Sequence, residues 1–263
     1  MKLKIMTYNI AQGRCYADDS KIADNGWAPE DLSACAQVIK ELAPDVCGLN
    51  EVGVFAKDRN PANQPEFLSA YTGMAHHYFG AALHFVPPSI ERDYGNAILS
   101  RHPILESETI KIPDPERRDE DAYYETRAIA KVKLDIAGGI TVLQTHFGLA
   151  VSEKQNAITT LCKIIDETEG PIILMGDFNI RPTDFLHEHL RARLFDTADI
   201  RKGEYLKTYP SYTHKESRSE NYPDCKIDYI YVSEHFKVNS IVAPQHRASD
   251  HYPYVTELEL EEA

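Results

Sequence analysis

The sequence predicts a mixed fold of helices and strands, and residues 1–263 are expected to form a single domain. Short segments of alternating apolar and polar residues, typical of strands, are interleaved with apolar stripes at helical spacing. No internal repeat and no low-complexity linker interrupts this pattern. The polar clusters described below come from both halves of the chain, and they can meet only if the two halves fold together.

The segments expected to form strands are short, apolar or alternating, and often end in a polar residue. They lie near residues 3–9, 46–51, 77–86, 94–100, 123–136, 140–146, 173–177, 226–232 and 252–255. Gly138 and Gly139 separate two of these segments by the length of a hairpin turn, so we expect those two strands to pair.

Three helices are expected from apolar stripes and capping residues. Between Asp31 and Leu42, apolar residues recur at spacings of three and four. Asn63-Gln64-Pro65-Glu66 is typical of a capped helix start with proline in the first turn. Ser152-Glu153-Lys154-Gln155 is a second capping box, and it predicts that the helix carrying the next apolar stripe begins there.

The composition is that of a globular protein with a sizeable core, because 43% of residues are hydrophobic and 26% are charged. No apolar stretch is long enough for a transmembrane segment, and the N-terminus shows no apolar leader. The five cysteines are odd in number and lack C-x-x-C spacing. We interpret them as free, mostly buried thiols, which favours a reducing compartment and a cytoplasmic location.

The net charge argues against long duplex DNA as the main partner. Acidic residues outnumber basic ones by 41 to 28, for a formal charge of −13. The run from Asp114 to Asp121 is acidic overall, and no basic stripe with interleaved aromatic residues is present. Proteins that bind nucleic acid draw much of their affinity from lysine and arginine on phosphates. A small or lipid-headgroup phosphoester is therefore the favoured substrate, with nucleic acid as a disfavoured alternative.

Polar residues gather where the expected strands end. Asp177 and Asn179 follow an apolar run and, being two residues apart on a strand, would share one face. Similar positions are occupied by Asn9, Glu51, His146, Asp228 and the pair Asp250-His251. Together they supply oxygen ligands for a hard cation, two histidines, and carboxylates able to orient them.

In order along the chain, these motifs resemble the endonuclease/exonuclease/phosphatase superfamily of metal-dependent phosphohydrolases. The matching elements are Thr-Tyr-Asn at 7–9, Asn-Glu at 50–51, Tyr-Gly-Asn-Ala-Ile-Leu-Ser at 94–100, Thr-His at 145–146, Gly-Asp-Phe-Asn at 176–179, Ile-Asp-Tyr at 227–229 and Ser-Asp-His at 249–251. One departure is Asn50, where the family often has glutamine before the metal-binding glutamate.

The resemblance implies an α+β fold, namely a four-layer α/β/β/α sandwich of two mixed sheets with outer helices. Periodicity alone indicates only mixed α and β structure. The resemblance also implies hydrolysis of phosphoester bonds with Mg2+ as the cofactor, and Mn2+ or Ca2+ as alternatives to it. One metal ion or two would both be consistent with these motifs.

Hydrolysis of a phosphoester needs an activated water, in-line geometry and positive charge on the phosphoryl oxygens. Glu51 is the best candidate for a metal ligand, since Mg2+ takes carboxylate oxygens and keeps several waters. Asn9 is expected to bind the same ion or one of its waters. Asp250 is expected to add to the metal site or to hold a turn. Without the family pattern, Asn9 would be read as a strand-end cap and Glu51 as a surface acid.

The remaining roles concern the proton transfers and the phosphate. His251 is the candidate general base or phosphate contact, and the family pattern makes Asp228 the partner on its other ring nitrogen. Asp177 would orient or deprotonate the attacking water, or protonate the leaving group. Asn179 would donate its amide hydrogens to a phosphate oxygen, and His146 would add a donor to the transition-state charge.

Two further residues are candidates for substrate binding. Asn96 is expected to position Glu51 or the phosphate. Arg127 is a candidate phosphate clamp, because a guanidinium matches phosphate in a bidentate manner. The alternative for Arg127 is an ion pair with Glu125, two residues away on the same face of an expected strand.

Segments near 11–30, 111–124 and 203–225 break the pattern and are expected to rim the site and influence substrate choice. Their aromatic residues are Trp27, Tyr123, Tyr124, Tyr205, Tyr209, Tyr212 and Tyr222, each of which could instead pack within its own loop. Three functions compete: a phosphodiesterase or phosphatase on a small phosphoester, an endonuclease or exonuclease, and a non-catalytic phosphate-binding module. The intact set of acids and histidines argues against the last.

Overall fold

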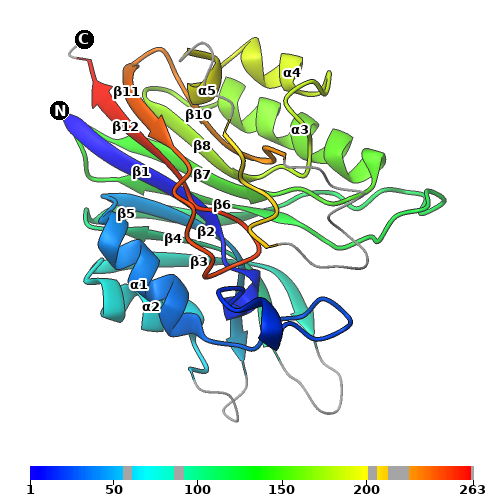
Figure 1. The fold of residues 1–263 in the computed structure, drawn as a ribbon. Coiled ribbons are helices and arrows are strands. Elements are labelled where there is room, and N and C mark those ends of the chain that lie inside the picture. The colour runs from blue at the N-terminus through cyan, green and yellow to red at the C-terminus, as the bar shows by residue number, and fades with distance from the viewer. Residues whose placement is uncertain (56–60, 86–91, 201–205, 213–224, 262–263) are drawn as a thin grey trace.

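Two six-stranded sheets lie face to face, and helices cover the outer face of each sheet (Figure 1). The computed structural model describes residues 1–55, 61–85, 92–200, 206–212 and 225–261. The arrangement confirms the expected four-layer α/β/β/α sandwich of mixed sheets.

The first sheet has the strand order β11-β12-β1-β2-β4-β3. Its strands are β1 (Lys2–Asn9), β2 (Val46–Phe55), β3 (His76–Phe85), β4 (Arg92–Ser100), β11 (Phe236–Val242) and β12 (Tyr254–Leu260). Only the pair β1 and β2 is parallel. Helix α1 (Leu32–Leu42) makes the crossover between these two strands, as a parallel pair requires.

The second sheet has the order β5-β6-β7-β8-β10-β9. Its strands are β5 (Ile104–Lys111), β6 (Ala128–Leu134), β7 (Ile140–His146), β8 (Ile172–Asp177), β9 (Phe195–Asp196) and β10 (Asp228–Val232). Here β7 and β8 are the parallel pair, joined by α3 (Val151–Asp166). Each sheet therefore contains one strand-helix-strand unit, and polar residues end β1, β7 and β8.

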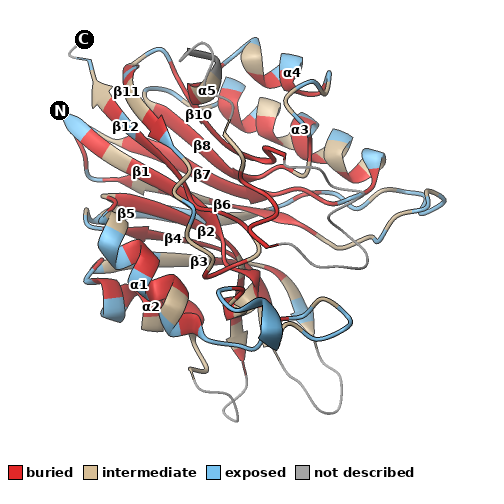
Figure 2. Cartoon of the chain, in the orientation of Figure 1, coloured by how far each residue is buried: buried red, intermediate tan, exposed pale blue. Residues whose placement is uncertain are grey.

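Apolar side chains fill three layers between these elements. One cluster lies between the sheets and takes residues from both, including Ile5, Val46, Val132 and Ile173. A second lies under α1 and α2 (Gln64–Thr72), and a third under α3 and α4 (His187–Arg191). Figure 2 shows the central strands of both sheets largely buried, while exposed residues concentrate on the outer helix faces, the connections and the edge strand β5. The short elements η1 (Ala11–Gly13), η2 (Asp19–Lys21) and α5 (Thr197–Ile200) complete the described structure.

Most expected elements are confirmed. The helix expected at 31–42 is α1, and Asn63 caps α2 by accepting from the backbone N–H of Glu66 at 3.1 Å. Gly138 and Gly139 both have positive φ angles, and they join the antiparallel strands β6 and β7. The five cysteines are free thiols. Among the described residues, every helix is too short or too polar to cross a membrane.

Some boundaries differ from the prediction, and the strands β5, β9 and β11 were not predicted. The strand expected at 123–136 covers only Ala128–Leu134, because the preceding residues are held by α3 instead of a strand partner. Helix α3 begins at Val151, not Ser152, and the capping contact is made by Glu153 to the N–H of Ala150 instead of by the predicted box at Ser152–Gln155. Glu120 from the preceding loop also accepts hydrogen bonds from the backbone N–H groups of Val151 and Ser152. Strand β5 was not predicted, and its largely exposed, charged surface explains the weak apolar pattern.

Candidate active site

The expected site residues lie at one end of the two sheets, where the parallel strands finish. Asn9 ends β1, His146 ends β7 and Asp177 ends β8. Asp228 begins β10 and pairs in register with Asp177 on the antiparallel neighbour. His251 lies just before β12. Strand register thus brings together side chains that are far apart in the sequence.

The carboxylate of Asp177 is the centre of this site. Asn9 donates from Nδ2 to Oδ2 of Asp177 at 3.1 Å. Nε2 of His146 and Nε2 of His251 lie 3.5 and 3.6 Å from the same oxygen. Oδ1 accepts a hydrogen bond from the backbone N–H of Asn179 at 3.0 Å. Burial raises the pKa of the Asp177 carboxyl to about 7, although the charge of His251 acts in the opposite direction.

Asp228 and His251 form the expected hydrogen-bonded pair. Nδ1 of His251 lies 2.9 Å from Oδ2 of Asp228, and both side chains are buried. Burial disfavours the protonated ring, but the charges of Asp228 and then Asp177 outweigh it, so the pKa of His251 is raised to about 10. The ring is therefore an imidazolium at neutral pH, with its Nε2–H facing Asp177.

Glu51 reaches the site because β2 bulges. Asn50 and Glu51 together oppose the single residue Asn96 of β4. The extra residue interrupts the alternation of faces, and Glu51 has a left-handed φ of 57°. Oε1 of Glu51 accepts from Nδ2 of Asn9 at 3.2 Å. Burial, and then the charge of Asp250, raise the pKa of Glu51.

The two asparagines of the expected site are partly engaged by the protein. Asn9 donates to both acids described above, and its Oδ1 accepts from the backbone N–H of Ala11 at 3.0 Å. Asn179 has a left-handed φ of 51°, and its Nδ2 donates to the carbonyl of Phe147 at 2.9 Å. Because an amide nitrogen carries two hydrogens, one hydrogen of Asn179 is left unused by the part of the chain that the structure describes.

Asp250 holds a turn and also acts on the acids of the site. Its Oδ1 accepts from Oγ of Ser249 at 3.2 Å, and its backbone carbonyl accepts from the N–H of Ser211 at 2.7 Å. Its charge raises the pKa of Glu51, so the two carboxylates lie close enough to interact. Both interpretations made from the sequence are therefore compatible with its position.

Arg127 forms the ion pair with Glu125 that the sequence left as an alternative, with 2.5 Å between its Nη1 and Oε1. The two residues precede β6, so the expectation that they share a strand face is wrong. Nη1 also lies 3.0 Å from Nδ1 of His146. A guanidinium can only donate, so Nδ1 is the acceptor and the ring proton lies on Nε2. Burial, and then the Arg127 charge, hold the pKa of His146 well below its usual value.

Asn96 is buried and holds Asn50, the neighbour of Glu51. Its Oδ1 accepts from Nδ2 of Asn50 at 2.7 Å, and its Nδ2 donates to the carbonyl of Ala128 at 2.8 Å. Asn96 therefore contacts Asn50, the neighbour of Glu51, and not Glu51 itself. This contact favours the expectation that Asn96 positions Glu51 over the expectation that it binds the phosphate.

Several residues near the site carried little signal in the sequence. Lys154 lies on the first turn of α3, half-buried, where its charge interacts with Asp177. Tyr94 is buried beside Glu51, and burial followed by that carboxylate raises the pKa of the tyrosine well above its usual value. The spacing of Lys154 after His146 could have pointed to it, because a helix that starts just after a site strand begins beside the site.

The loop aromatics divide into two groups. The ring of Tyr209 packs 4.8 Å from that of His251, and Tyr212 stacks on Tyr16 at 4.6 Å, which joins two of the three expected rim loops. Trp27 and Tyr123 are instead 58% and 66% exposed. Tyr124 accepts a hydrogen bond from the backbone N–H of Glu120, within its own loop. Tyr205 and Tyr222 lie outside the described residues.

The donor set at the site suits a hard divalent cation. Asp177, Asp228 and His251 present ligand atoms within 4.8 Å of one another. Oδ1 of Asp228 is buried without a hydrogen-bond partner among the described residues. Glu51 and Asp250 add two more carboxylates, whose negative charges repel each other. Carboxylate oxygens are the ligands that Mg2+ prefers, and a cation would relieve this crowding of negative charge.

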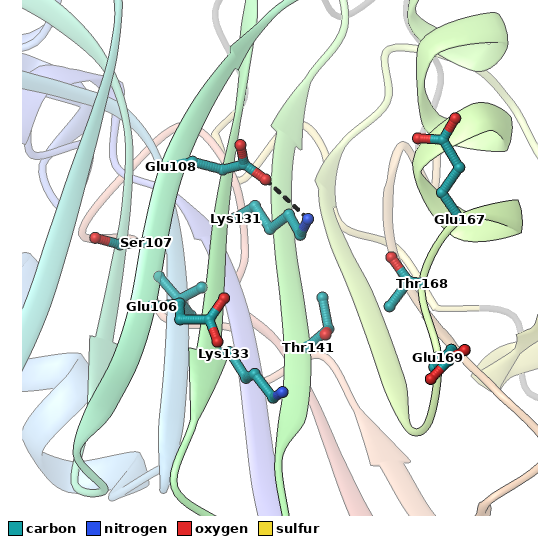
Figure 3. A pocket seen from close by; sticks show the side chains of 10 residues that line it. Glu106, Ser107, Glu108, Lys131, Lys133, Thr141, Glu167, Thr168 and Glu169 are labelled. Carbon is teal, nitrogen blue, oxygen red and sulfur yellow. Dashed lines mark hydrogen bonds and ion pairs between the residues drawn. The ribbon is translucent and has the colours of Figure 1, made fainter.

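A separate groove of about 490 Å³ lies at the opposite ends of β6 and β7 from the site (Figure 3). It is lined by charged side chains of both signs, including the ion pair of Lys131 and Glu108, whose Nζ and Oε1 are 2.8 Å apart. None of its lining residues belongs to the expected site. Its open, mixed-charge surface offers no convergent set of catalytic groups.

A family model described as the Endonuclease/Exonuclease/phosphatase family matches residues 6–251. The chain belongs to this family. It is accordingly a phosphoester hydrolase of that family, and Asp177, Asp228 and His251 form a buried cluster that could hold a metal ion.

Solved structures of the family share the fold. An endonuclease/exonuclease/phosphatase from Beutenbergia cavernae has a TM-score of 0.76 and 24% identity, covering 100% of this chain and 72% of its own. Mannosyl-6-phosphatase from Bacteroides thetaiotaomicron has a TM-score of 0.68 and 16% identity, covering 98% and 100%. D. rerio TDP2 complexed with a single-strand DNA product has a TM-score of 0.65 and 16% identity, covering 98% and 99%. No curated protein matches the chain.

Proposed function

We propose that this protein is an Mg2+-dependent hydrolase of a small or lipid-headgroup-like phosphoester, either a phosphodiester or a phosphomonoester. The observation that carries the proposal is the convergence of Asn9, His146 and His251 on one oxygen of Asp177, with Glu51 beside them. Mn2+ or Ca2+ could replace Mg2+ on the same oxygen ligands.

The metal would be held by Glu51, assisted by Asn9 and Asp250, with the carboxylates of Asp177 and Asp228 nearby. The ring of His251, which is protonated in this proposal, would not be a ligand. When bound, the metal would supply positive charge to the phosphoryl oxygens and so stabilise the charge that develops in the transition state. The bulge in β2 turns Glu51 toward Asp177, so the ligand from one sheet faces the acid from the other. Both carboxyls have raised pKa values, because burial leaves their negative charge poorly compensated without a cation.

Asp177 is the general base in this proposal. A carboxyl with a pKa of about 7 can accept a proton from the attacking water at neutral pH. His251 is already protonated at that pH, because its pKa is about 10, and so it serves as a donor instead. Asp228 orients the ring and stabilises its positive charge through the 2.9 Å hydrogen bond.

The two histidines present N–H groups to the same place. His146 is neutral and carries its proton on Nε2, and His251 is charged with its Nε2–H near the same oxygen of Asp177. Preorganised donors of this kind stabilise the phosphoryl oxygens in the transition state. The remaining amide hydrogen of Asn179 adds a further donor from the end of β8.

The substrate class is supported by charge. A net charge of −13 disfavours a long polyanion, since nucleic-acid binding depends on many cationic contacts. The fold shared with the mannosyl-6-phosphatase is consistent with a small phosphoester, and the fold shared with DNA-bound TDP2 keeps a nuclease as the second candidate. A binding module without catalysis would not need both a metal carboxylate and a hydrogen-bonded aspartate–histidine pair.

The test is a metal-dependent screen of the purified protein. After treatment with EDTA, turnover of model phosphomonoesters, phosphodiesters, sugar phosphates, sphingomyelin and plasmid DNA is measured with and without Mg2+. We expect one of the small esters to be hydrolysed faster than plasmid is nicked. Efficient nicking with a steep salt dependence, and no turnover of small esters, would make the nuclease the better assignment. No turnover of any substrate would favour the binding module.

Glu51→Ala tests the metal site directly. Loss of a ligand from a site with few protein ligands should weaken Mg2+ binding and lower kcat/KM by about 10³-fold or more, because the metal contributes several kcal/mol to the transition state. Glu106→Ala, in the groove at the other end of β6 and β7, is the matched control and should leave both quantities unchanged. Equal effects of the two changes would exclude Glu51 as the metal ligand.

We also propose a cytoplasmic location, on the basis of the free thiols. Cys35, Cys47 and Cys225 are buried and unlinked. Rapid alkylation of cell extracts, followed by denaturation, should find all thiols reduced, whereas recovery of the protein in an exported fraction would contradict the proposal.

A further inference from the structure

Asn50 precedes the metal-binding candidate and shares its bulge. In β2 upstream of this point, Cys47 and Leu49 face the helices, while Val46 faces the opposite sheet. Val52 again faces the helices, although strict alternation would turn it inward. The chain therefore gains one residue at the bulge, and both Asn50 and Glu51 turn toward the second sheet.

The Asn50 side chain uses all of its hydrogen-bonding capacity in the interior. Its Nδ2 donates to Oδ1 of Asn96 and to the carbonyl of Thr145, each at 2.7 Å. Its Oδ1 accepts from Nε2 of Gln144 at 2.9 Å and from the backbone N–H of Asp177 at 3.0 Å. One partner lies on its own sheet, and three lie on β7 and β8 of the other sheet.

The surrounding residues are shaped for this contact. The side chain of Gln144 crosses the face of β2 at Gly48, where an added Cβ would lie 1.9 Å from Oε1 of Gln144. A side chain at residue 48 would therefore displace the glutamine that reaches Asn50. Both amides are fully buried, with 0% of their surface exposed. The long side chain of Gln144 reaches from β7 to the Asn50 amide, with 2.9 Å between its Nε2 and Oδ1 of Asn50.

We propose that Asn50 is a positioning residue that fixes the backbone of Glu51 relative to Asp177 and thereby holds the metal-binding carboxylate in place. The amide is fixed to the backbone N–H of Asp177 on one side, and on the other it is covalently adjacent to the left-handed Glu51. Its bond to Asn96 holds the residue directly opposite the bulge. Movement of the bulge would therefore move one carboxylate relative to the other.

The positioning role of Asn50 rests on the proposed metal site. The experiment therefore measures metal affinity instead of turnover. Mn2+ binding to the full-length protein is titrated by following free Mn2+ with electron paramagnetic resonance. We expect Asn50→Ala to weaken binding at least tenfold. Asn50→Asp keeps the size and both acceptor contacts but loses the two donors, and we expect it to weaken binding despite its added negative charge.

A double-mutant cycle distinguishes positioning from general destabilisation. If Asn50 acts through Glu51, adding Asn50→Ala to a Glu51→Gln protein should change Mn2+ affinity by less than threefold. Multiplying effects in the double variant would overturn the proposal. Ser100→Ala removes a buried hydroxyl at the far end of β4, and it should lower stability without changing Mn2+ affinity.

The outcomes separate this inference from the function on which it rests. If Glu51→Gln leaves Mn2+ affinity unchanged, the proposed metal site itself is wrong. If Glu51→Gln weakens binding while Asn50→Ala and Asn50→Asp do not, the metal site stands and the positioning role of Asn50 is excluded. Should Asn50→Ala fail to fold, as judged by circular dichroism, the isosteric Asn50→Asp carries the test alone.

Discussion

At the scale of single residues, the Asp228–His251 pair should behave as one unit. Asp228 orients the His251 ring and stabilises its positive charge through a 2.9 Å contact. Removing either residue therefore removes the same donor, the charged Nε2–H of His251. We expect Asp228→Asn and His251→Ala each to lower kcat/KM by about 10²–10⁴-fold. The double variant should be little worse than either single one, as steady-state kinetics can show. Effects that multiply would mean that the two residues act separately.

Asp177 should show a conflict between function and stability. An acid whose pKa is raised on folding, here to about 7, stabilises the fold only while protonated, so its contribution is lost as pH rises from about 4 toward 7. Asp177→Asn cannot ionise and should abolish activity. In EDTA at pH 8 it should raise the free energy of unfolding by about 1–3 kcal/mol, and at pH 4 the gain should disappear.

Urea unfolding of both proteins at the two pH values measures this difference. A variant that is less stable than the wild type at pH 8 would show that the charges of His251 and the neighbouring amides fully compensate the buried carboxylate. Such a result would also weaken the assignment of Asp177 as the base, since an acid with an ordinary pKa binds protons poorly at neutral pH.

The sequence indicated the residues that converge at the candidate site better than the residues that hold them in place. Asn9, His146, Asp177 and Asp228 sit at strand ends, where pattern and motif coincide. The sequence could not decide whether Arg127 binds phosphate or pairs with Glu125. That choice depends on the conformation of the loop before β6, which is held by a hydrogen bond to α3.

At the scale of elements, the start of α3 fixes the segment that carries Arg127. Oε2 of Glu153 accepts from the N–H of Ala150 at 3.1 Å, and Oε1 accepts from the N–H of Glu125 at 2.9 Å. Glu153→Ala would leave two N–H groups without their acceptor, and we expect a loss of about 2 kcal/mol in the free energy of unfolding. Hydrogen exchange should also rise at Glu125, as mass spectrometry can detect.

Glu153→Gln is the matched control, because it keeps an acceptor oxygen of the same reach. It should lose less stability than the alanine variant. Comparable losses would show that the charge of Glu153, and not its hydrogen bonds, holds the segment to the helix.

Elements with strong periodicity were predicted, and those defined by tertiary contacts were not. Helix α1 has a clean apolar stripe and begins within one residue of the prediction. The start of α3 is held by a local contact, from the N–H of Ala150 to Glu153, and by Glu120, which is about thirty residues away in sequence and lies outside any local capping rule. The bulge in β2 could not be predicted either, because one extra residue in a strand interrupts the alternation of apolar and polar residues only briefly.

At the scale of the whole molecule, the two sheets should unfold together. The apolar cluster between them takes Leu3, Ile5 and Val46 from one sheet and Val132, Val142 and Ile173 from the other. Neither sheet could bury its inner face alone, so residues 1–263 are expected to form one domain. We predict a single calorimetric transition whose van't Hoff and calorimetric enthalpies agree. Two separable transitions would mean that the sheets are independent units.

The four-layer architecture followed from the family motifs and not from periodicity. Alternating patterns locate strands such as β7, but they do not say which strands are neighbours. The order of the second sheet places β10 between β8 and β9, and this order depends on contacts made across the whole chain.

The two ends of the described chain offer convenient points of attachment. Lys2 on β1 pairs with Glu259 on β12, and Figure 1 shows both termini together at one end of the sandwich. Asn9 lies at the other end of β1, about 23 Å along the strand from Lys2 at ~3.3 Å per residue. A fusion partner, fluorophore or surface tether joined at either terminus would therefore stand well away from the reacting groups, and a short peptide linking the ends would suit circular permutation.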